Sequence, residues 1–462
     1  LDGRGAPGSF TGIAGDALFT GTGAAVTVQA TRLEVLEGSS ISTSTQSARA
    51  GQPLRVVADS LLVDGGGNAR TATGISADTG GAGDAGSLSI VAREFSVVDE
   101  GLVSTSTLGS GRGGAMSIEA TTVHLARSGG LASVAGGAGN AGRIDVRASA
   151  SVDITEGGFI VASSGGAGAA GRIRIDTARF SASGSDPTNG QRSRVASRAL
   201  AGSSGDSGRI DIVASGAVEL GPEALLSIAN DAREVSGVER GTSIILVQGA
   251  GIGLQGAEIT AAAGAAADAG AIALQSSGDV RLADSTLRTS AAQGNGGPID
   301  IDATGVVRLR NSAVTTSVDG REGGDGGNIR IRGQALVLAS GFVQANTAAA
   351  RGTGGTVTID VPVLVPDGNN VFVGGNRIAE FRPDVPGYNV IQAAAPDGLG
   401  GRLDVTRPEL NLSGSLAALI TQRIDFGLLG RDLCEAGTDS SFTILGRGAL
   451  PAPASAPLRI RP

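Results

Sequence analysis

A motif of about 28 residues recurs along most of this chain, and no other feature constrains its fold as strongly. Each copy begins with a glycine, after which apolar and polar residues alternate. Nine copies are clear, and they begin at Gly86 (GSLSIVA), Gly114 (GAMSIEA), Gly142 (GRIDVRA), Gly171 (GRIRIDT), Gly208 (GRIDIVA), Gly270 (GAIALQS), Gly297 (GPIDIDA), Gly327 (GNIRIRG) and Gly355 (GTVTIDV). Their intervals are 28, 28, 29, 37, 62, 27, 30 and 28 residues, and the interval of 62 divides at Gly241 (GTSIILV) into 33 and 29. Weaker copies begin at Gly23 and Gly51.

Each repeat contains three short segments with the pattern of a β-strand. Positions two and four after the glycine are apolar and flank a polar residue, as at Ile144 and Val146. This period of two is typical of a strand with one buried face. A second alternating pair follows about nine residues after the glycine, as at Val152 and Ile154, and a third short segment follows at Phe159 (FIVASS). The repeat contains no helical period, which excludes leucine-rich repeats and helical solenoids.

We therefore expect an all-β fold, a parallel β-helix (solenoid) of about twelve coils with three short strands per coil. Because crossover connections between parallel strands are almost always right-handed, a right-handed β-helix is predicted. Equivalent residues of successive coils then lie one above another, about 4.8 Å apart. The repeat thus predicts columns of equivalent side chains along the molecule.

These columns have predictable contents. Positions two and four should form interior ladders of Ile, Leu and Val, and position six, which is usually Ala, should form a tight inward corner. Position three should point outward, where Asp145, Arg174 and Asp211 on consecutive coils would stack opposite charges. Asp300 and Arg330 would form another such pair. Exposed pairs contribute only about 0 to 1 kcal/mol each, so their expected role is to fix the register between coils.

The composition fits such a core and excludes several classes of function. Glycine accounts for 77 residues, aromatic residues for 2 % and hydrophobic residues for 40 %, which predicts a core of small and branched aliphatic side chains. A net charge of −8 and an isoelectric point near 4.9 argue against nucleic acid and anionic lipid as partners. No apolar run reaches the 18 residues of a membrane-spanning helix. Cys434 is the only cysteine, so no internal disulfide is possible.

Side chains for catalysis are sparse. Sugar-cleaving sites need paired carboxylates or a metal with a basic residue, and this chain has one His, one Tyr and no Lys. His124 alternates with apolar neighbours, which places it on the outer face. We interpret the acids of the first strand as solvated outward residues and expect no catalytic, cofactor-binding or metal-binding residue; these acids are Asp145, Asp176, Asp211, Asp300 and Asp302.

The glycine-rich turns between repeats resemble two known binding motifs. GGAGDAG from Gly80, GGAGNAG from Gly136 and GGDGG from Gly323 are similar to the calcium-binding nonapeptide. That motif binds calcium when it recurs every nine residues, whereas here the spacing is about 28 and the Asp is often replaced. A dinucleotide site is excluded because no helix follows the glycines. The glycines are therefore expected to serve the turns.

The repeat degrades after Val361, where several prolines interrupt it. We predict a β-helix rod over residues 1–361 and the degenerate last coils with a C-terminal cap over 362–430. The cap would include a short helix at LAALITQRI from Leu416. Residues 431–462 read as a Pro- and Ala-rich tail.

Two segments resemble the filamentous haemagglutinin-like exoproteins of two-partner secretion, in particular their large cyanobacterial and proteobacterial group. One is the repeat, seen best from Gly139 (GNAGRIDVRASASVDITEGGFIVASS), and it covers most of the chain. The other is the ending from Leu433 (LCEAGTDSSFTILGRGALPAPA), with its Cys, SSF and GRGxLP elements, which is shorter but more specific.

This resemblance implies export through an outer-membrane transporter of Gram-negative type and a secreted or cell-surface location. It implies an adhesive role, with glycans or proteins of host or neighbouring cells as partners, and it implies no catalytic residue. The secretion domain of the family, which would engage the transporter, is not visible before Leu1, so we expect the chain to be a piece of a longer protein. Cys434 belongs to the recognised ending and is expected to be a buried free thiol.

The expected function is that of a structural or adhesive exoprotein without catalysis. The alternative is a carbohydrate-active enzyme on a β-helix, such as a polysaccharide lyase or glycosidase, which would show clustered acids in a groove along one long face. A carrier rod for a C-terminal toxin is disfavoured, because only the Pro-rich tail follows the repeat.

Overall fold

The computed structural model describes residues 1–4, 11–67, 72–232, 243–264, 267–321, 323–383 and 385–405. The chain divides into a unit from Leu1 to Pro408 and a second unit from Glu409 to Pro462. The predicted helix from Leu416, Cys434 and the ending from Leu433 lie outside the described residues.

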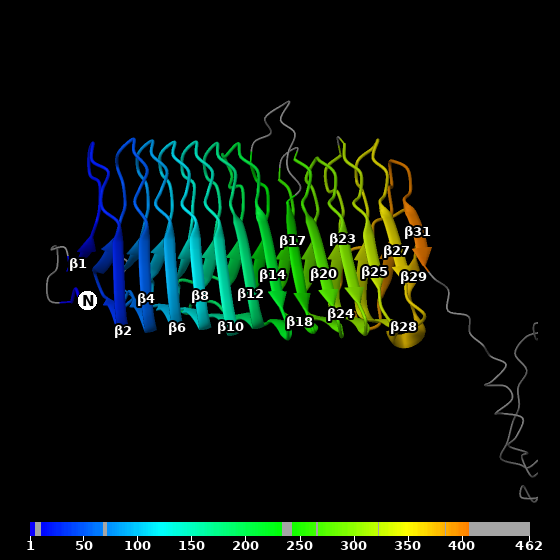
Figure 1. The fold of residues 1–462 in the computed structure, drawn as a ribbon. Coiled ribbons are helices and arrows are strands. Elements are labelled where there is room, and N and C mark those ends of the chain that lie inside the picture. The colour runs from blue at the N-terminus through cyan, green and yellow to red at the C-terminus, as the bar shows by residue number, and fades with distance from the viewer. Residues whose placement is uncertain are drawn as a thin grey trace, which may run out of the picture. The chain divides into compact units, whose positions relative to one another are not determined.

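The described unit is an all-β stack of coils, as the repeat predicts (Figure 1). All strand pairings in it are parallel, and apart from the short β29 each strand pairs with the equivalent strand of an adjacent coil, which shows the long parallel sheet of a solenoid. One unbroken ladder of position-two residues runs through the unit, and it consists of Val26, Leu54, Leu88, Met116, Ile144, Ile173, Ile210, Ile245, Ile272, Ile299, Ile329, Val357 and Leu403.

The number of separate strands in a coil varies along the stack. In the N-terminal coils the first and second predicted strands join into one, and these are β2 (Val26–Leu36), β4 (Leu54–Asp64), β6 (Leu88–Val98), β8 (Met116–Ala126), β10 (Ile144–Thr155) and β12 (Arg172–Ser183). The third strands of these coils and of the segment before them are β1 (Thr11–Ala14), β3 (Ser39–Ser42), β5 (Gly74–Ser76), β7 (Leu102–Ser104), β9 (Gly130–Ala132), β11 (Phe159–Val161) and β13 (Arg194–Ala196).

Three separate strands per coil occur in the middle of the stack. They are β14 (Arg209–Ala214), β15 (Ala217–Leu220), β16 (Leu225–Ser227), β17 (Ile244–Gly249), β18 (Gly251–Gln255), β19 (Glu258–Thr260), β20 (Ala271–Ser276), β21 (Val280–Ala283) and β22 (Thr286–Arg288). We call the bend between the first and second strands of a coil its first corner. Gly216 and Gly278 lie at the first corner of two of these coils, where glycine allows a sharper bend that ends the strand.

The C-terminal coils join the second and third strands instead. Their strands are β23 (Ile299–Ala303), β24 (Val306–Thr315), β25 (Ile329–Arg332), β26 (Ala335–Gln344) and β27 (Thr356–Asp360). The second corner is the bend between the second and third strands of a coil. In these coils it consists of one residue with a left-handed backbone conformation, Asn311 in β24 and Ser340 in β26, so the strand continues through it.

The interior contains one continuous aliphatic cluster that runs from Leu33 to Ala393. The predicted columns at positions two and four are buried from Leu54 to Ile359 and half-buried in the first and last coils, and most position-six residues are buried as well, although Ala120 is half-buried. We call the residue that begins each repeat, two positions before the ladder, its anchor. Three of the predicted anchors were wrong. Because Ile245 pairs with Ile210, Ser243 occupies the anchor position and Gly241 does not. The same register gives Ala24 and Gln52 in place of Gly23 and Gly51.

The second corner of the coils has a backbone feature that the repeat did not reveal. Every non-glycine residue with a left-handed backbone among the described residues lies at this corner, from Glu37 to Ser340. The corner also carries stacked opposite charges, in addition to those that we expected at position three. Arg127 Nε lies 2.5 Å from Asp99 Oδ1 in the coil before, and Arg127 Nη1 lies 3.5 Å from Glu156 Oε2 in the coil after.

Buried hydroxyl groups just after the third strand hold the glycine-rich turn against the coil. Thr105 Oγ1 donates to the carbonyl oxygen of the anchor glycine Gly114 at 2.9 Å, and Thr107 Oγ1 donates to that of Gly111 at 2.8 Å. Thr289 repeats the first contact at Gly297, 2.6 Å away. The segment that follows the third strand is thus the polar side of the interior, where hydroxyl groups satisfy turn carbonyls that would otherwise be buried without partners.

The last described coil contains a long insertion. Strand β28 (Leu364–Pro366) pairs with the second-strand part of β26, and β30 (Val390–Gln392) pairs with its third-strand part. Residues 367–389 therefore replace the second corner of this coil. They contain a short 3-10 helix, η1 (Asp367–Asn369), and β29 (Phe372–Val373), which pairs with β30. The final strand, β31 (Arg402–Val405), pairs with β27.

Candidate functional site

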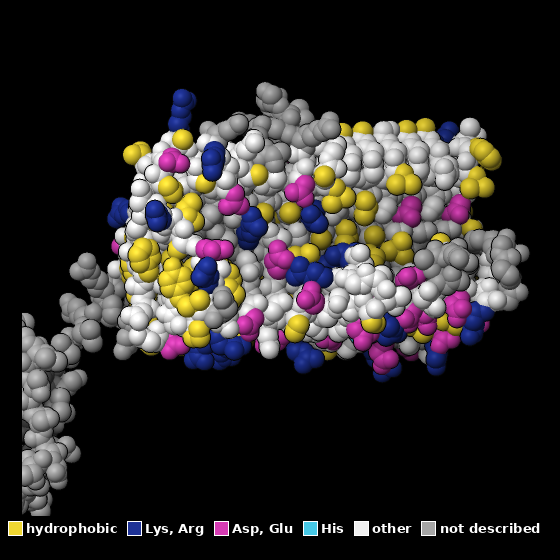
Figure 2. Space-filling view, turned by 180° about the vertical axis from the view of Figure 1, so that it is seen from behind, with side chains coloured by type: hydrophobic (Ala, Val, Ile, Leu, Met, Phe, Trp, Pro, Cys, Tyr) yellow, Lys and Arg dark blue, Asp and Glu magenta, His cyan; other side chains and the backbone are white. Residues whose placement is uncertain are grey.

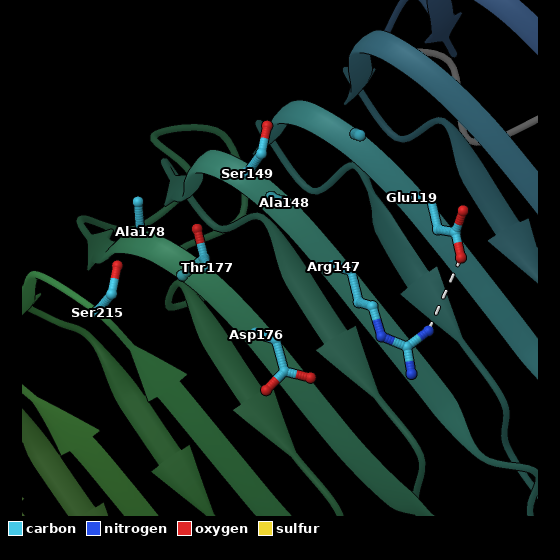
Figure 3. A pocket seen from close by; sticks show the side chains of 9 residues that line it. Glu119, Arg147, Ala148, Ser149, Asp176, Thr177, Ala178 and Ser215 are labelled. Carbon is cyan, nitrogen blue, oxygen red and sulfur yellow. Dashed lines mark ion pairs between the residues drawn. The ribbon is translucent and has the colours of Figure 1, made fainter.

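The candidate site is an open groove of about 470 Å³ at the first corner of four successive coils. Its charged residues are Glu119, Arg147 and Asp176, which occupy position five on consecutive coils and lie in register (Figure 3). The remaining lining residues are small and are Ala120, Ala148, Ser149, Thr177, Ala178 and Ser215. The groove exists because the small corner residues leave the outer surface hollow between the two strand faces.

The carboxylates of this groove are held in ion pairs. Arg147 Nη1 lies 3.9 Å from Glu119 Oε1, the pair drawn in Figure 3. Asp176 accepts two hydrogen bonds from Arg174 on its own strand, at 2.7 and 2.8 Å. The backbone positions of Glu119 and Asp176 are two coils apart, about 9.6 Å, and Arg147 stands between them. A cation in this place neutralises the two acids.

Position three differs from the prediction in its burial and in its partners. Asp145, Arg174 and Asp211 do lie in register on consecutive coils. However, Asp145 is 8 % exposed and Asp211 only 1 % exposed, so neither is the solvated residue that we expected. Arg143 Nε lies 2.6 Å from Asp145 Oδ2.

Asp211 is buried because two guanidinium groups close over it. Arg209, on the same strand, and Arg172, on the coil before, each place Nη2 at 2.7 Å from its carboxylate. Burial by itself raises the pKa of Asp211, but the hydrogen bonds and charges of Arg209 and Arg172 outweigh burial and bring its pKa below the ordinary value. Asp211 therefore stays ionised at neutral pH and is unsuited to act as a general acid.

We expect Asp211→Asn to lower the free energy of unfolding by about 2 kcal/mol at pH 7, since the charge-assisted bonds are lost while both arginines stay partly exposed. A depressed carboxyl pKa contributes stability above the unfolded value, about 3.9, and this contribution disappears as the pH falls through the folded value. The difference between wild type and variant in urea unfolding should therefore shrink below about pH 4.

The control for this prediction is Asp302→Asn, because Asp302 is half exposed and lies 3.5 Å from Arg332. Its effect should stay below about 1 kcal/mol. An equal loss in both variants, or a loss at Asp211 that does not depend on pH, would show that the two arginines do not stabilise the carboxylate.

The pKa of one other carboxyl group moves in the direction that a general acid needs. Burial raises the pKa of Asp78, against the hydrogen bonds that it accepts from Ser104 Oγ and Ser106 N at 2.8 and 2.6 Å. Asp78 is not among the residues that line the groove. Its two contacts join successive coils, which indicates a structural role.

The remaining predicted residues are dispersed. His124 is half-buried and lies in register with Asp153, which accepts hydrogen bonds from Ser151 and Ser181. Asp300 lies in register with Arg330. Among the described residues, no three His, Cys, Asp or Glu side chains gather closely enough to hold a metal ion.

The Asp and Asn side chains of the glycine-rich turns join successive coils, a structural role that the sequence did not predict. Asp84 Oδ1 accepts a hydrogen bond from Arg112 N, 28 residues on, at 2.8 Å, and Asn140 Oδ1 accepts one from Ala169 N at 2.9 Å. Asp268 and Asp325 make the same contact to the next coil. Each of these residues stands two positions before an anchor glycine, and that spacing is visible in the sequence. Asp and Asn interchange at this place because the contact needs only one side-chain oxygen as acceptor.

No family model, curated protein or solved structure matches this chain. Within the part of the chain that the structure describes, no helix has the length and apolar character needed to cross a membrane.

Proposed function

We propose that this chain is a right-handed parallel β-helix of about twelve coils that serves as the rod of a secreted or cell-surface exoprotein, with a structural and adhesive role and no catalysis. The observation that carries the proposal is the unbroken position-two ladder from Val26 to Leu403. A stack in which each coil repeats the one below builds a long, stiff support with extended outer faces. Right-handedness follows from the crossover rule for parallel strands.

The charge pattern of the groove favours an adhesive function over that of a carbohydrate-active enzyme. Glycoside hydrolysis needs one carboxyl group that holds a proton and a second one that is ionised. In the groove, Arg147 pairs with Glu119, and Arg174 pairs with Asp176, which leaves neither acid free to serve in such a couple.

The resemblance of the repeat and of the ending from Leu433 to two-partner secretion exoproteins supports the proposed location. On this proposal an outer-membrane transporter of that system is the export partner, and it engages a secretion domain N-terminal to this rod. The proposed contacts of the exported rod are glycans or proteins on host or neighbouring cells.

Two measurements on the purified protein test this proposal. Beads coated with the protein should adhere to bacterial or host cells more than beads coated with albumin, and the protein should release no product from polyuronides or neutral glycans. Beads that do not adhere above the albumin level would contradict the adhesive role. Turnover of a polysaccharide that Glu119→Gln or Asp176→Asn abolishes would instead establish a carbohydrate-active enzyme at the groove.

A further inference from the structure

The insertion at residues 367–389 differs in composition from the coils that carry it. The whole chain has ten Phe, one Tyr and no Trp. Phe372, Phe381 and the only tyrosine, Tyr388, all lie in this insertion, whereas the interior of the repeats is mainly aliphatic. Binding residues are often carried by loops on a rigid scaffold. A segment that interrupts the repeat and contains several aromatic side chains is therefore a candidate ligand-binding site.

The insertion is held in place by an aromatic cluster on the last coils. Phe342 of β26 is fully buried, and its ring lies edge-on to the rings of Phe381 and Tyr388, with centroid distances of 5.0 and 5.3 Å. Val390 and Ala313 are buried in the same cluster. These contacts fix the orientation of the tyrosine ring.

A network of buried amide side chains fixes the backbone of the insertion. Gln392 Oε1 accepts from Ala379 N at 2.9 Å, and Gln392 Nε2 donates to the carbonyl oxygens of Arg377 and Gly374 at 2.7 and 3.1 Å. Gln344 Nε2 donates to Ala379 O at 2.7 Å. Buried amides with all partners in place specify one conformation, so the loop is preorganised for binding.

Two adjoining hollows lie on this loop. The larger, of about 490 Å³, is lined by Asn370, Val371, Phe372, Val385, Pro386, Gly387, Tyr388 and Asn389. The second, of about 340 Å³, is lined by Glu380, Arg382, Val385 and Tyr388. Because both contain Val385 and Tyr388, they form one surface with the tyrosine at its centre. Figure 2 shows hydrophobic side chains gathered at the left end of the view, which is the C-terminal end of the stack.

The chemistry of this surface fits a sugar. Phe372 is 46 % exposed, so part of its ring is open to a ligand, and pyranose rings present apolar C–H faces that pack on aromatic rings. The side chains of Asn370, Glu380 and Arg382 supply donors and acceptors for hydroxyl groups. The guanidinium of Arg382 lies 3.8 Å from the carboxylate of Glu380, so the rim has no net charge and does not favour an acidic sugar.

We propose that the two hollows around Tyr388 bind a neutral oligosaccharide, with Phe372 as the stacking platform and the Glu380–Arg382 pair as the contact for hydroxyl groups. The inference deepens the proposed function and rests on it, because it assigns the adhesive contact to one end of the rod. The rest of the exposed face then serves as support.

The intrinsic fluorescence of the protein tests this proposal, because a chain with one tyrosine and no tryptophan reports on Tyr388 alone. Titration with neutral cello-, malto-, manno- and galacto-oligosaccharides should give a saturable change with at least one series, and oligogalacturonates should give none. Phe372→Ala should weaken that binding by about tenfold or more. Phe19→Ala is the matched control, since Phe19 is 83 % exposed and lies outside the insertion, and its binding should stay within about twofold of wild type.

The outcomes separate this inference from the proposed function. If no neutral series changes the fluorescence or releases heat in calorimetry, or if Phe372→Ala binds as wild type does, the site is refuted, while adhesion of coated beads would leave the adhesive role standing. If a neutral series binds and Phe372→Ala abolishes binding, the site is established even where beads fail to adhere. Equal binding of oligogalacturonates would refute the assignment to neutral sugars.

Discussion

Replacing Ile210 by Asp should abolish the cooperative thermal transition of the β-type circular dichroism signal. Ile210 is fully buried in the position-two ladder, between Ile173 below and Ile245 above. A carboxylate there has no partner in the aliphatic interior, and such burial costs several kcal/mol. Because each coil of a solenoid contacts only its neighbours, damage at one coil interrupts the stack on both sides. We expect a loss of more than about 4 kcal/mol in the free energy of unfolding.

The control variant for Ile210 lies on the same strand. Val213 stands three residues further along β14, at outward position five, and is half-buried. Val213→Asp should lower the free energy of unfolding by less than about 1 kcal/mol. If Ile210→Asp kept the wild-type spectrum and midpoint, or if both variants lost the same amount, the alternation of inward and outward residues would be wrong.

Replacing Gly168 by Ala should be nearly as damaging, although it adds one methyl group. A Cβ atom on Gly168 would overlap the carbonyl oxygen of Gly139, which occupies the equivalent place in the coil before. Gly139 has the same relation to Gly111, and Gly205 to Gly168, so the glycines form a column in which each backbone lies directly on the next. No side chain moves to relieve the overlap, so we expect a loss of about 3 kcal/mol or more.

Gly165→Ala provides the comparison within the same turn. Its Cβ atom would have no neighbour closer than 3.9 Å, and its backbone is not left-handed. The melting temperature of Gly165→Ala should therefore stay close to that of wild type, while that of Gly168→Ala falls by several degrees. Similar melting temperatures for the two variants would show that the turns of successive coils are not in contact.

Much of the fold could be predicted from the sequence because the ladder depends on a local pattern. The alternation at residues such as Ile144 and Val146 assigns a strand and its buried face at once, and the constant spacing assigns its neighbour. The anchors at Gly23, Gly51 and Gly241 were wrong by one or two residues, because there a neighbouring glycine was taken for the residue in register.

The burial of Asp145 and Asp211 could not be read from alternation. Position three does point outward, but Arg143, Arg172 and Arg209 lie beside it, and their side chains cover the carboxylates. Alternation gives the side of the strand on which a residue lies, whereas coverage depends on side chains two residues away in the same coil, such as Arg209, and on the adjacent coil, such as Arg172. The same limit applies to the groove, which residues of four coils line together.

The insertion at residues 367–389 could not be predicted from the sequence for a different reason. Its prolines and the broken repeat were interpreted as degenerate last coils with a cap, in which β30 and β31 pair with β26 and β27, but nothing in that pattern indicated an ordered insertion between them. The contacts that order the insertion, such as Gln392 with Ala379 and Phe342 with Tyr388, join residues with no repeating pattern. Only the concentration of aromatic residues in this segment could have indicated it in advance.

Cysteine cross-linking between coils tests the stacked arrangement most directly. Ser89 and Ser117 lie in register on adjacent coils and point outward, so their Cα atoms should be about 4.8 Å apart, within the range that a disulfide spans. In a Cys434→Ser background, Ser89→Cys with Ser117→Cys should oxidise to an internal disulfide that thiol alkylation and mass measurement detect. Ser89→Cys with Asp145→Cys, two coils apart and about 9.6 Å, should stay reduced. Failure of the first pair, or equal cross-linking of the second, would contradict the parallel stack.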